Sequence, residues 1–157
     1  MSRYYINQDK NRCIGCLSCE VCCEKNKGIP EENRVRLCQI VVVDKRKAKN
    51  LPRDAYVYMG CFHCDKPYCV AACPTGAMTK RESDGIVYVD ADKCVGCKAC
   101  MIACPWGAVQ WNPLTAKVQK CDLCMDRLDQ GLKPVCATIC TTGCLSLGDL
   151  QAAENDI

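Results

Sequence analysis

Short runs of β-branched and aromatic residues recur along the chain, separated by polar turns and cysteine-rich segments. Runs of this kind predict strands, which lie at 4–6, 37–43, 56–59, 85–89, 108–111 and 117–119. The Asn112-Pro113 turn between the last two predicts a hairpin. Residues 56–59 are expected to be the return strand of 37–43, across the polar, basic segment 44–50. The pattern therefore predicts several small hairpins.

The cysteine-rich segment 94–105 has the spacing C-x2-C-x2-C-x3-C-P. This is the bacterial ferredoxin spacing for [4Fe–4S] clusters. Three thiolates two residues apart let one tight loop surround a cube, and the fourth, one helical turn further on, points toward a second cube. Gly96 lacks a Cβ where the backbone must approach the cluster, and it tolerates positive φ. Such a run implies a partner run elsewhere in the sequence.

Three more cysteine runs are present. Residues 13–23 read C-x2-C-x2-C-x3-C and leave Cys22 over, and residues 61–74 read C-x2-C-x4-C-x3-C-P. Residues 121–140 read C-x2-C-x11-C-x3-C, which alone fits iron–sulfur or zinc and beside the other runs indicates iron–sulfur. His63, the sole histidine, is expected to order its loop or to donate a hydrogen bond to cluster sulfur; a redox or metal role is the alternative.

An internal repeat accounts for the spare cysteines. The segments 73–77, 104–108 and 140–144 align without gaps, and Cys144 falls where the other copies have alanine. Cys22 precedes the last cysteine of its run, where two of the other runs have alanine and one has isoleucine. Cys38 stands alone in a predicted strand and is expected to be a small buried residue. Removing these three from the 19 cysteines leaves sixteen, enough for four cubes.

The cysteine content permits two other interpretations. A disulfide framework is disfavoured because the N-terminus has no apolar signal core, the cysteine count of 19 is odd, and the spacing is that of ferredoxins. Structural zinc is the second alternative, although zinc sites seldom use C-x2-C-x2-C. The hydrophobic share of 49% includes the cysteines, and the sequence has one phenylalanine, so a thin apolar core is expected. Metal binding should then contribute to the folding free energy.

The formal net charge of +3 changes sign once clusters are counted. Sixteen thiolates and four oxidised cores of charge +2 would bring the loaded protein to about −5. A nucleic-acid partner is therefore not indicated. No hydrophobic run is long enough to span a membrane. We expect a cytoplasmic protein, and the sequence also permits export together with a signal-bearing partner.

The four runs, with Cys61-Phe62-His63-Cys64-Asp65-Lys66-Pro67-Tyr68-Cys69 second and the C-x11-C gap last, resemble a known family. It comprises the four-cluster iron–sulfur subunits of molybdenum and tungsten pterin oxidoreductases, such as dimethyl sulfoxide reductase, formate dehydrogenases, polysulfide reductase and tungsten aldehyde oxidoreductases. The resemblance covers residues 1 to about 148. The short insertion and the lack of a C-terminal anchor resemble the compact soluble versions that accompany tungsten aldehyde oxidoreductases or soluble formate dehydrogenases.

The resemblance implies a ligand set for each of four [4Fe–4S] clusters. In that family each run gives three ligands to one cube and its last cysteine to the cube of a partner run, the second run pairing with the third and the first with the fourth. We name the implied sites by their cysteines: site A has Cys61, Cys64, Cys69 and Cys104; site B has Cys94, Cys97, Cys100 and Cys73; site C has Cys13, Cys16, Cys19 and Cys140; and site D has Cys121, Cys124, Cys136 and Cys23.

The implied fold is α+β, with two intertwined bacterial-ferredoxin-like modules of short β-hairpins and short helices around four iron–sulfur cubes. Residues 60–107 would form a central module, 1–30 and 108–148 an outer module, 31–59 a β-hairpin insertion, and 149–157 a short tail. The two ends of the chain should then lie together in the outer module.

The resemblance implies an electron-transfer subunit that is not catalytic alone, since no residue suggests a substrate-binding acid or base. Its partners would be a large molybdenum or tungsten pterin catalytic subunit and an acceptor, either a flavin or NAD subunit or a ferredoxin. The alternative is a free-standing polyferredoxin or a carrier associated with hydrogenase or CO dehydrogenase. The sequence leaves open the choice of metal and substrate in the partner.

Overall fold

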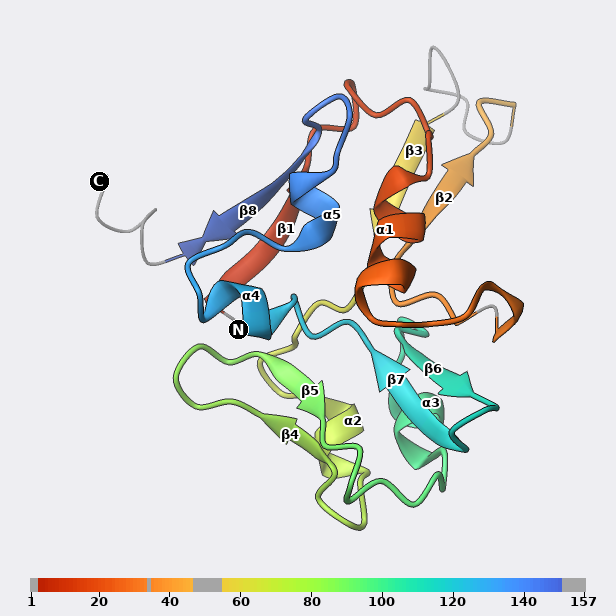
Figure 1. The fold of residues 1–157 in the computed structure, drawn as a ribbon, viewed down its shortest axis with the longest axis vertical. Helices are drawn as coiled ribbons and strands as arrows, with labels where there is room; N and C mark the ends of the chain where they lie inside the picture. The colour runs from red at the N-terminus through yellow and green to blue at the C-terminus, as the bar shows by residue number, and fades with distance from the viewer. Residues whose placement is uncertain (1–2, 34, 47–54, 151–157) are drawn as a thin grey trace.

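The computed structural model describes residues 3–33, 35–46 and 55–150. These residues form small antiparallel strand pairs and short helices (Figure 1). The strands are β1 Tyr4–Gln8, β2 Gln39–Val43, β3 Ala55–Met59, β4 Met78–Lys80, β5 Val87–Val89, β6 Val109–Asn112, β7 Lys117–Lys120 and β8 Leu145–Asp149. The helices are α1 Ser18–Asn26, α2 Tyr68–Ala71, α3 Ala99–Ala103, α4 Met125–Leu128 and α5 Val135–Thr138, with a 3-10 turn at Glu31–Asn33. The fold is therefore α+β, as the sequence predicts.

Both predicted hairpins are present. β2 pairs with β3, and β6 pairs with β7 across the turn that contains Pro113. The strand predicted at 37–43 begins at Gln39, so Cys38 lies just before β2. The strand predicted at 85–89 is shorter, because β5 begins at Val87 after the Gly85 turn, and it pairs with β4, which was not predicted.

The two ends of the described residues are joined by a sheet. β1 pairs antiparallel with β8, with Tyr4 opposite Asp149 and Gln8 opposite Leu145. Arg3 Nη2 and Asp149 Oδ2 add an ion pair of 2.7 Å at the end of this ladder. The pairing brings the first and last cysteine runs beside each other, since helix α1 follows β1 and helix α5 precedes β8.

Helices pair in two places that lie at opposite ends of the molecule. Helix α1 contacts α5, and α2 contacts α3. In Figure 1 the first pair lies with β1, β8, β2 and β3, and the second pair lies with the β4–β5 and β6–β7 hairpins. We call the first group the outer half (3–59 and 121–150) and the second group the central half (61–120). The module boundaries expected from the resemblance stay a prediction; the β6–β7 hairpin packs with the central half.

The buried interior consists largely of cysteines, which agrees with the thin apolar core that the composition predicts. The cluster in the central half contains Cys69, Met78, Val87, Cys100, Val109 and Val118. The outer half has two clusters, one of Cys13, Cys19, Cys136, Cys144 and Leu145, and one of Cys23, Ile29, Val35, Leu37 and Cys38. Each of these groups of buried side chains therefore contains cysteines from at least two segments of the sequence.

A buried carboxylate ties the insertion to the first cysteine run. Glu20 in α1 is 4% exposed; its Oε1 accepts a hydrogen bond from Ile40 N at 2.5 Å, and its Oε2 pairs with Arg36 Nη1 at 2.8 Å. A buried carboxylate is tolerated only when it is paired in this way. Glu20 thus fixes β2 against helix α1.

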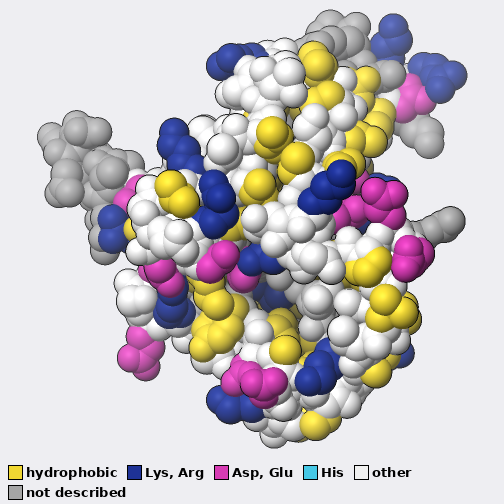
Figure 2. Space-filling view, viewed as in Figure 1, with side chains coloured by type: hydrophobic (Ala, Val, Ile, Leu, Met, Phe, Trp, Pro, Cys, Tyr) yellow, Lys and Arg dark blue, Asp and Glu magenta, His cyan; other side chains and the backbone are white. Residues whose placement is uncertain are grey.

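The surface carries both signs of charge. On the face shown in Figure 2, basic and acidic side chains alternate, and hydrophobic side chains are exposed over both halves. The basic segment 44–50 lies outside the described residues from residue 47 onward. No helix in the described ranges has the length and apolarity needed to cross a bilayer.

Candidate metal centres

The cysteines of site A surround one cavity in the central half. All four thiols, those of Cys61, Cys64, Cys69 and Cys104, line the same pocket. Aromatic side chains complete its wall; Phe62 and Trp106 stand edge to face with ring centroids 5.1 Å apart. Three of these thiols come from the second run, and the fourth comes from the end of the third run.

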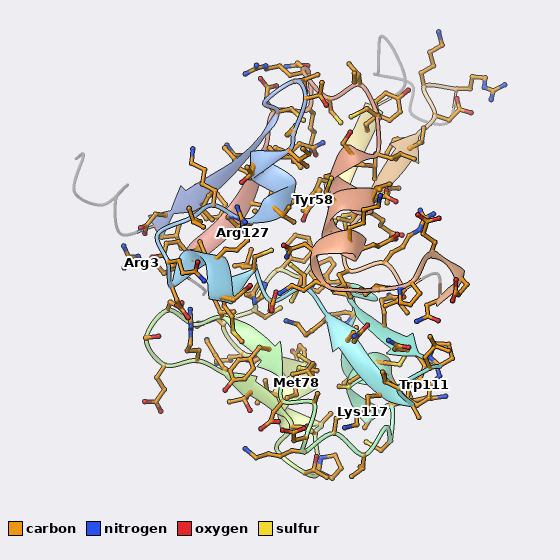
Figure 3. All side chains as sticks on the ribbon, in the orientation of Figure 1. Arg3, Tyr58, Met78, Trp111, Lys117 and Arg127 are labelled. Carbon is orange, nitrogen blue, oxygen red and sulfur yellow. The ribbon has the colours of Figure 1, made fainter. Side chains whose placement is uncertain are left out.

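The cysteines of site B surround the neighbouring cavity. The pocket is lined by apolar side chains, which include Met78, and by the thiols of Cys73, Cys94, Cys97 and Cys100. Figure 3 shows Met78 in the central half, on the β4–β5 hairpin. Here three thiols come from the third run and one from the end of the second run, so the two runs exchange their last cysteines.

The cysteines of site C surround a cavity in the outer half. All four thiols, those of Cys13, Cys16, Cys19 and Cys140, line the same pocket. Cys144 lines the same cavity, and its Sγ lies 3.4 Å from Cys140 Sγ. The sequence repeat interprets Cys144 as a packing residue and gives no signal that it lies beside the site.

At site D, Cys23 and Cys121 pack in one cluster with Tyr58, which also contacts Cys136. Burial raises the pKa values of Cys121, Cys124 and Cys136, and the nearby Cys23 thiolate raises each of them further. Tyr58 donates its hydroxyl to Cys136 Sγ at 3.6 Å. Site D thus combines three cysteines of the fourth run with the last cysteine of the first run.

Left-handed backbone shapes the loops around sites B and C in the same way. Gly15 and Gly96 have φ of 67° and 70°, and the residues after the second cysteines, Leu17 and Lys98, have φ of 61° and 63°. A Cβ on Gly96 would overlap the carbonyl oxygen of Ala116. Non-glycine residues in this region cost about 1–2 kcal/mol each. The strain curls each loop so that its three thiols converge on one cavity.

Backbone N–H groups point at several of the thiol sulfurs. His63 N donates to Cys61 Sγ, Met78 N to Cys73 Sγ, and Leu123 N to Cys121 Sγ, each at 3.4 Å. Hydrogen bonds of this kind stabilise negative charge on sulfur, which favours the thiolate form that binds metal. They also raise the reduction potential of an iron–sulfur group.

Sites A, B and C suit an iron–sulfur group. Within the described ranges, no cluster of three or more His, Cys, Asp or Glu side chains is arranged around a single metal ion. The thiols of sites A, B and C each line one pocket, four thiols to a pocket, and the pocket walls are mostly apolar. Four thiolates around such a space are the donor set of a [4Fe–4S] cluster.

Neighbouring sites lie close enough for their thiolates to interact. Burial raises the pKa of Cys100 at site B to about 11, and Cys69 of site A adds to the increase. Burial raises the pKa of Cys121 at site D, and Cys61 of site A adds to it. Burial raises the pKa of Cys19 at site C to about 12, and Cys136 of site D adds to it.

His63 orders its loop, as one of its predicted roles requires. Its Nδ1 accepts a hydrogen bond from Val87 N at 3.0 Å, which ties the loop of site A to β5. Burial, helped by the positive charge of Lys120, lowers the pKa of His63 to about 2, so the ring is neutral. The side chain is 1% exposed, and its Nε2 finds no hydrogen-bond partner among the described residues. The bond to cluster sulfur stays a prediction.

Nothing in the sequence predicts that two side chains, those of Lys120 and Tyr58, lie at the candidate sites. Lys120 is buried and lines the cavity of site A, although it reads as a polar position of a strand. Tyr58 reads as one of several strand aromatics, yet its hydroxyl reaches site D. The spare cysteines differ in their surroundings: Cys38 is buried and its Sγ lies 3.6 Å from Cys19 O, whereas Cys22 is half-buried.

Comparison with known proteins identifies the family. Residues 52–150 match the family model described as a 4Fe-4S dicluster domain. This protein belongs to that family. It is 39% identical to the B subunit of anaerobic dimethyl sulfoxide reductase from Escherichia coli (strain K12), over 96% of this chain and 75% of the relative. It is 38% identical to the B subunit of polysulfide reductase from Wolinella succinogenes, over 99% of this chain and 81% of the relative.

A third relative carries the role in its name. The thiosulfate reductase electron transfer subunit of Salmonella typhi is 38% identical over 98% of this chain and 79% of its own length. The resemblance to the iron–sulfur subunits of pterin oxidoreductases is thus confirmed. A structure of the BamBC complex of benzoyl coenzyme A reductase covers 98% of this chain and 87% of its own, with a TM-score of 0.46 and 21% identity.

Proposed function

We propose that this chain is an electron-transfer subunit that holds four [4Fe–4S] clusters in two intertwined ferredoxin-like modules. The observation that carries the proposal is the exchange of cysteines between runs: the site A and site B cavities each combine three thiols of one run with the last thiol of the other. Site C repeats the arrangement with Cys140 from the far end of the sequence. The family match supports the cluster type.

The contacts between sites define a linear order. Site B adjoins site A because Cys100 and Cys69 share one buried cluster, site A adjoins site D because Cys61 and Cys121 line one pocket, and site D adjoins site C because Cys136 and Cys19 share another cluster. The order B–A–D–C runs from the central half, which holds helices α2 and α3, to the outer half, which holds helices α1 and α5 (Figure 1). A row of sites with two free ends suits a relay between two partners.

When bound, each cluster accepts and donates one electron, and this chemistry belongs to the cofactor. The protein positions the thiolates and excludes water with apolar walls such as Phe62 and Trp106 at site A. It also adjusts the stability of the reduced state through the N–H groups that bond to Cys61, Cys73 and Cys121. The chain itself then needs no acid, base or nucleophile.

We propose a molybdenum or tungsten pterin enzyme of the aldehyde oxidoreductase or formate dehydrogenase type as the catalytic partner, with a flavin or NAD subunit or a ferredoxin as acceptor. A cytoplasmic location is part of this proposal. Relatives named as B subunits of dimethyl sulfoxide and polysulfide reductases support a catalytic partner of the pterin class. Co-purification of the native protein tests the point, since a fixed subunit elutes with a large pterin-containing polypeptide and a free polyferredoxin elutes alone.

The cluster assignment is tested by iron analysis of the anaerobically purified protein. Four cubes require about sixteen iron and sixteen sulfide per chain. Cys104→Ala should damage the cluster at site A and spare site B, whereas Cys73→Ala should do the reverse; EPR of each reduced variant distinguishes the two. The proposal would be contradicted by two cubes per chain or by stoichiometric zinc at site D. It would also be contradicted if each replacement damaged only the cluster held by the first three cysteines of the run that contains the replaced cysteine.

A further inference from the structure

A lysine side chain is buried at the junction of the two halves. Lys120 is the last residue of β7 and is 5% exposed. Its Nζ donates hydrogen bonds to the carbonyl oxygens of Val87 and Cys121, the latter at 2.6 Å. Lysine is almost never buried to this extent unless its charge is compensated.

No carboxylate compensates this charge in the described part of the sequence, where the ion pairs involve other residues. Two carbonyl oxygens satisfy hydrogen bonds but supply only partial negative charge. Isolated buried charges are strongly unfavourable, so the ammonium requires a negative group nearby. The thiolates of the proposed cluster sites are the negative groups within reach.

Lys120 faces two sites at once. Its side chain lines the cavity of site A together with Cys61, Cys69 and other thiols. Its backbone is covalently joined to Cys121 of site D. Its Nζ also donates to the carbonyl oxygen of Cys121 at 2.6 Å, which holds the ammonium beside the backbone of site D. The ammonium is therefore close enough to stabilise negative charge at either site.

We propose that Lys120 is a fixed positive charge shared by sites A and D, which raises the reduction potentials of the clusters bound there and favours electron transfer between the two halves. This inference rests on the proposed four-cluster function. Reduction adds one negative charge to a cluster that is already anionic, and a nearby cation in a medium of low dielectric constant stabilises that charge. Sites B and C lie beyond sites A and D in the row, so the effect there is smaller.

The test is an EPR-monitored redox titration of the full-length protein, anaerobically purified with its clusters. Lys120→Met removes the charge and keeps a side chain of similar length, and Lys120→Gln keeps a hydrogen-bond donor. We expect the equilibrium constant for reduction at sites A and D to fall at least tenfold in both variants, which is about 59 mV for a one-electron couple. The ligand variants Cys104→Ala and Cys23→Ala assign the signals of sites A and D.

Lys117→Met is the matched control, because Lys117 lies on the same strand and its Nζ donates to Ala91 O on an exposed surface (Figure 3). It removes the same charge and should leave all four potentials nearly unchanged. Lys120→Arg keeps the charge and should stay within a few-fold of the wild type. Three results would overturn the inference. The first is an equal shift of the reduction potentials in Lys117→Met and Lys120→Met, and the second is no shift in Lys120→Gln. The third is failure of all three Lys120 variants to load clusters.

The wild-type protein separates this inference from the proposed function. Four clusters per wild-type molecule, with unchanged potentials in the Lys120 variants, would refute the role of Lys120 and leave the electron-transfer function intact. Fewer than four clusters in the wild type would refute the proposed function itself.

Discussion

Removing the hydroxyl of Tyr58 tests whether a single hydrogen bond sets the reduction potential of the cluster at site D. Tyr58 Oη donates to Cys136 Sγ at 3.6 Å, and its ring packs between the two apolar clusters of the outer half (Figure 3). Burial and the thiolates of Cys121, Cys38 and Cys136 raise the pKa of Tyr58 well above its usual value, so the hydroxyl keeps its proton. Tyr58→Phe removes only this donor and preserves the ring.

The expected shift follows from the strength of one hydrogen bond. A hydrogen bond contributes about 0.5–1.5 kcal/mol, which converts to about 20–65 mV for a one-electron couple. Negative charge on Cys136 sulfur grows on reduction, so losing the donor lowers the potential. We therefore expect the cluster at site D to titrate about 20–65 mV lower in Tyr58→Phe, with the other three unchanged.

Tyr56→Phe serves as the control for this measurement. Tyr56 lies two residues away on β3 and packs against Gly15, but its hydroxyl makes no hydrogen bond within the described residues. EPR-monitored titration should show all four potentials unchanged in this variant. An unchanged site D in Tyr58→Phe, or a shift at site B, would refute the reasoning.

Three further changes test the ligand assignment and the fold. Replacing Cys22, Cys38 and Cys144 together with alanine should leave iron content unchanged; loss of a whole cluster would make one of them a ligand. Gly96→Ala should lose iron from site B and melt earlier than Gly28→Ala, because both have positive φ but only Gly96 meets backbone. Glu20→Ala and Arg36→Ala should each lower the free energy of unfolding by at least about 1.5–3 kcal/mol in denaturant titrations, because either change removes the pairing of the buried carboxylate. Arg46→Ala, which removes a surface ion pair with Asp44, should cost less than about 1 kcal/mol.

The sequence predicts those parts of the fold that depend on local pattern. The β2–β3 and β6–β7 hairpins are visible because β-branched residues lie on either side of turn residues. The cysteine runs are visible because their spacing is set by the shape of one loop around one cube. Both signals need only neighbours in the sequence.

Strands β4 and β8 were not predicted, β4 because it is very short and β8 because its partner is distant in the sequence. β4 has three residues, which are too few to show a strand pattern in the sequence. It forms a strand because it pairs with Val87–Val89. β8 pairs with β1 across nearly the whole sequence, and nothing in residues 145–149 alone specifies that partner. Sequence periodicity reports burial along one segment and carries no information about a non-local partner.

The side chains around the sites were missed for a related reason. Lys120 stands in a polar stretch that a strand on the surface would also show, and its burial follows from the packing of β7 against β5. Cys144 was interpreted as packing because of its place in the repeat, and the structure adds that its sulfur faces Cys140. In both cases the decisive fact is the position of a second segment.

The junction between the halves explains why the row of sites is continuous. The polypeptide passes between the two halves at two places, residue 60 and the Lys120–Cys121 peptide bond. Each crossing carries a cysteine, and Cys61 and Cys121 line one common pocket. Arg81 Nη1 and Asp129 Oδ2 add an ion pair of 2.8 Å between the halves. Because the connections between the halves are also the ligand-bearing segments of sites A and D, the halves cannot separate without breaking the row of sites. Lys120 lies at the second crossing, where its Nζ donates to Val87 O and Cys121 O, so the charge that we propose for sites A and D lies at the junction of the halves.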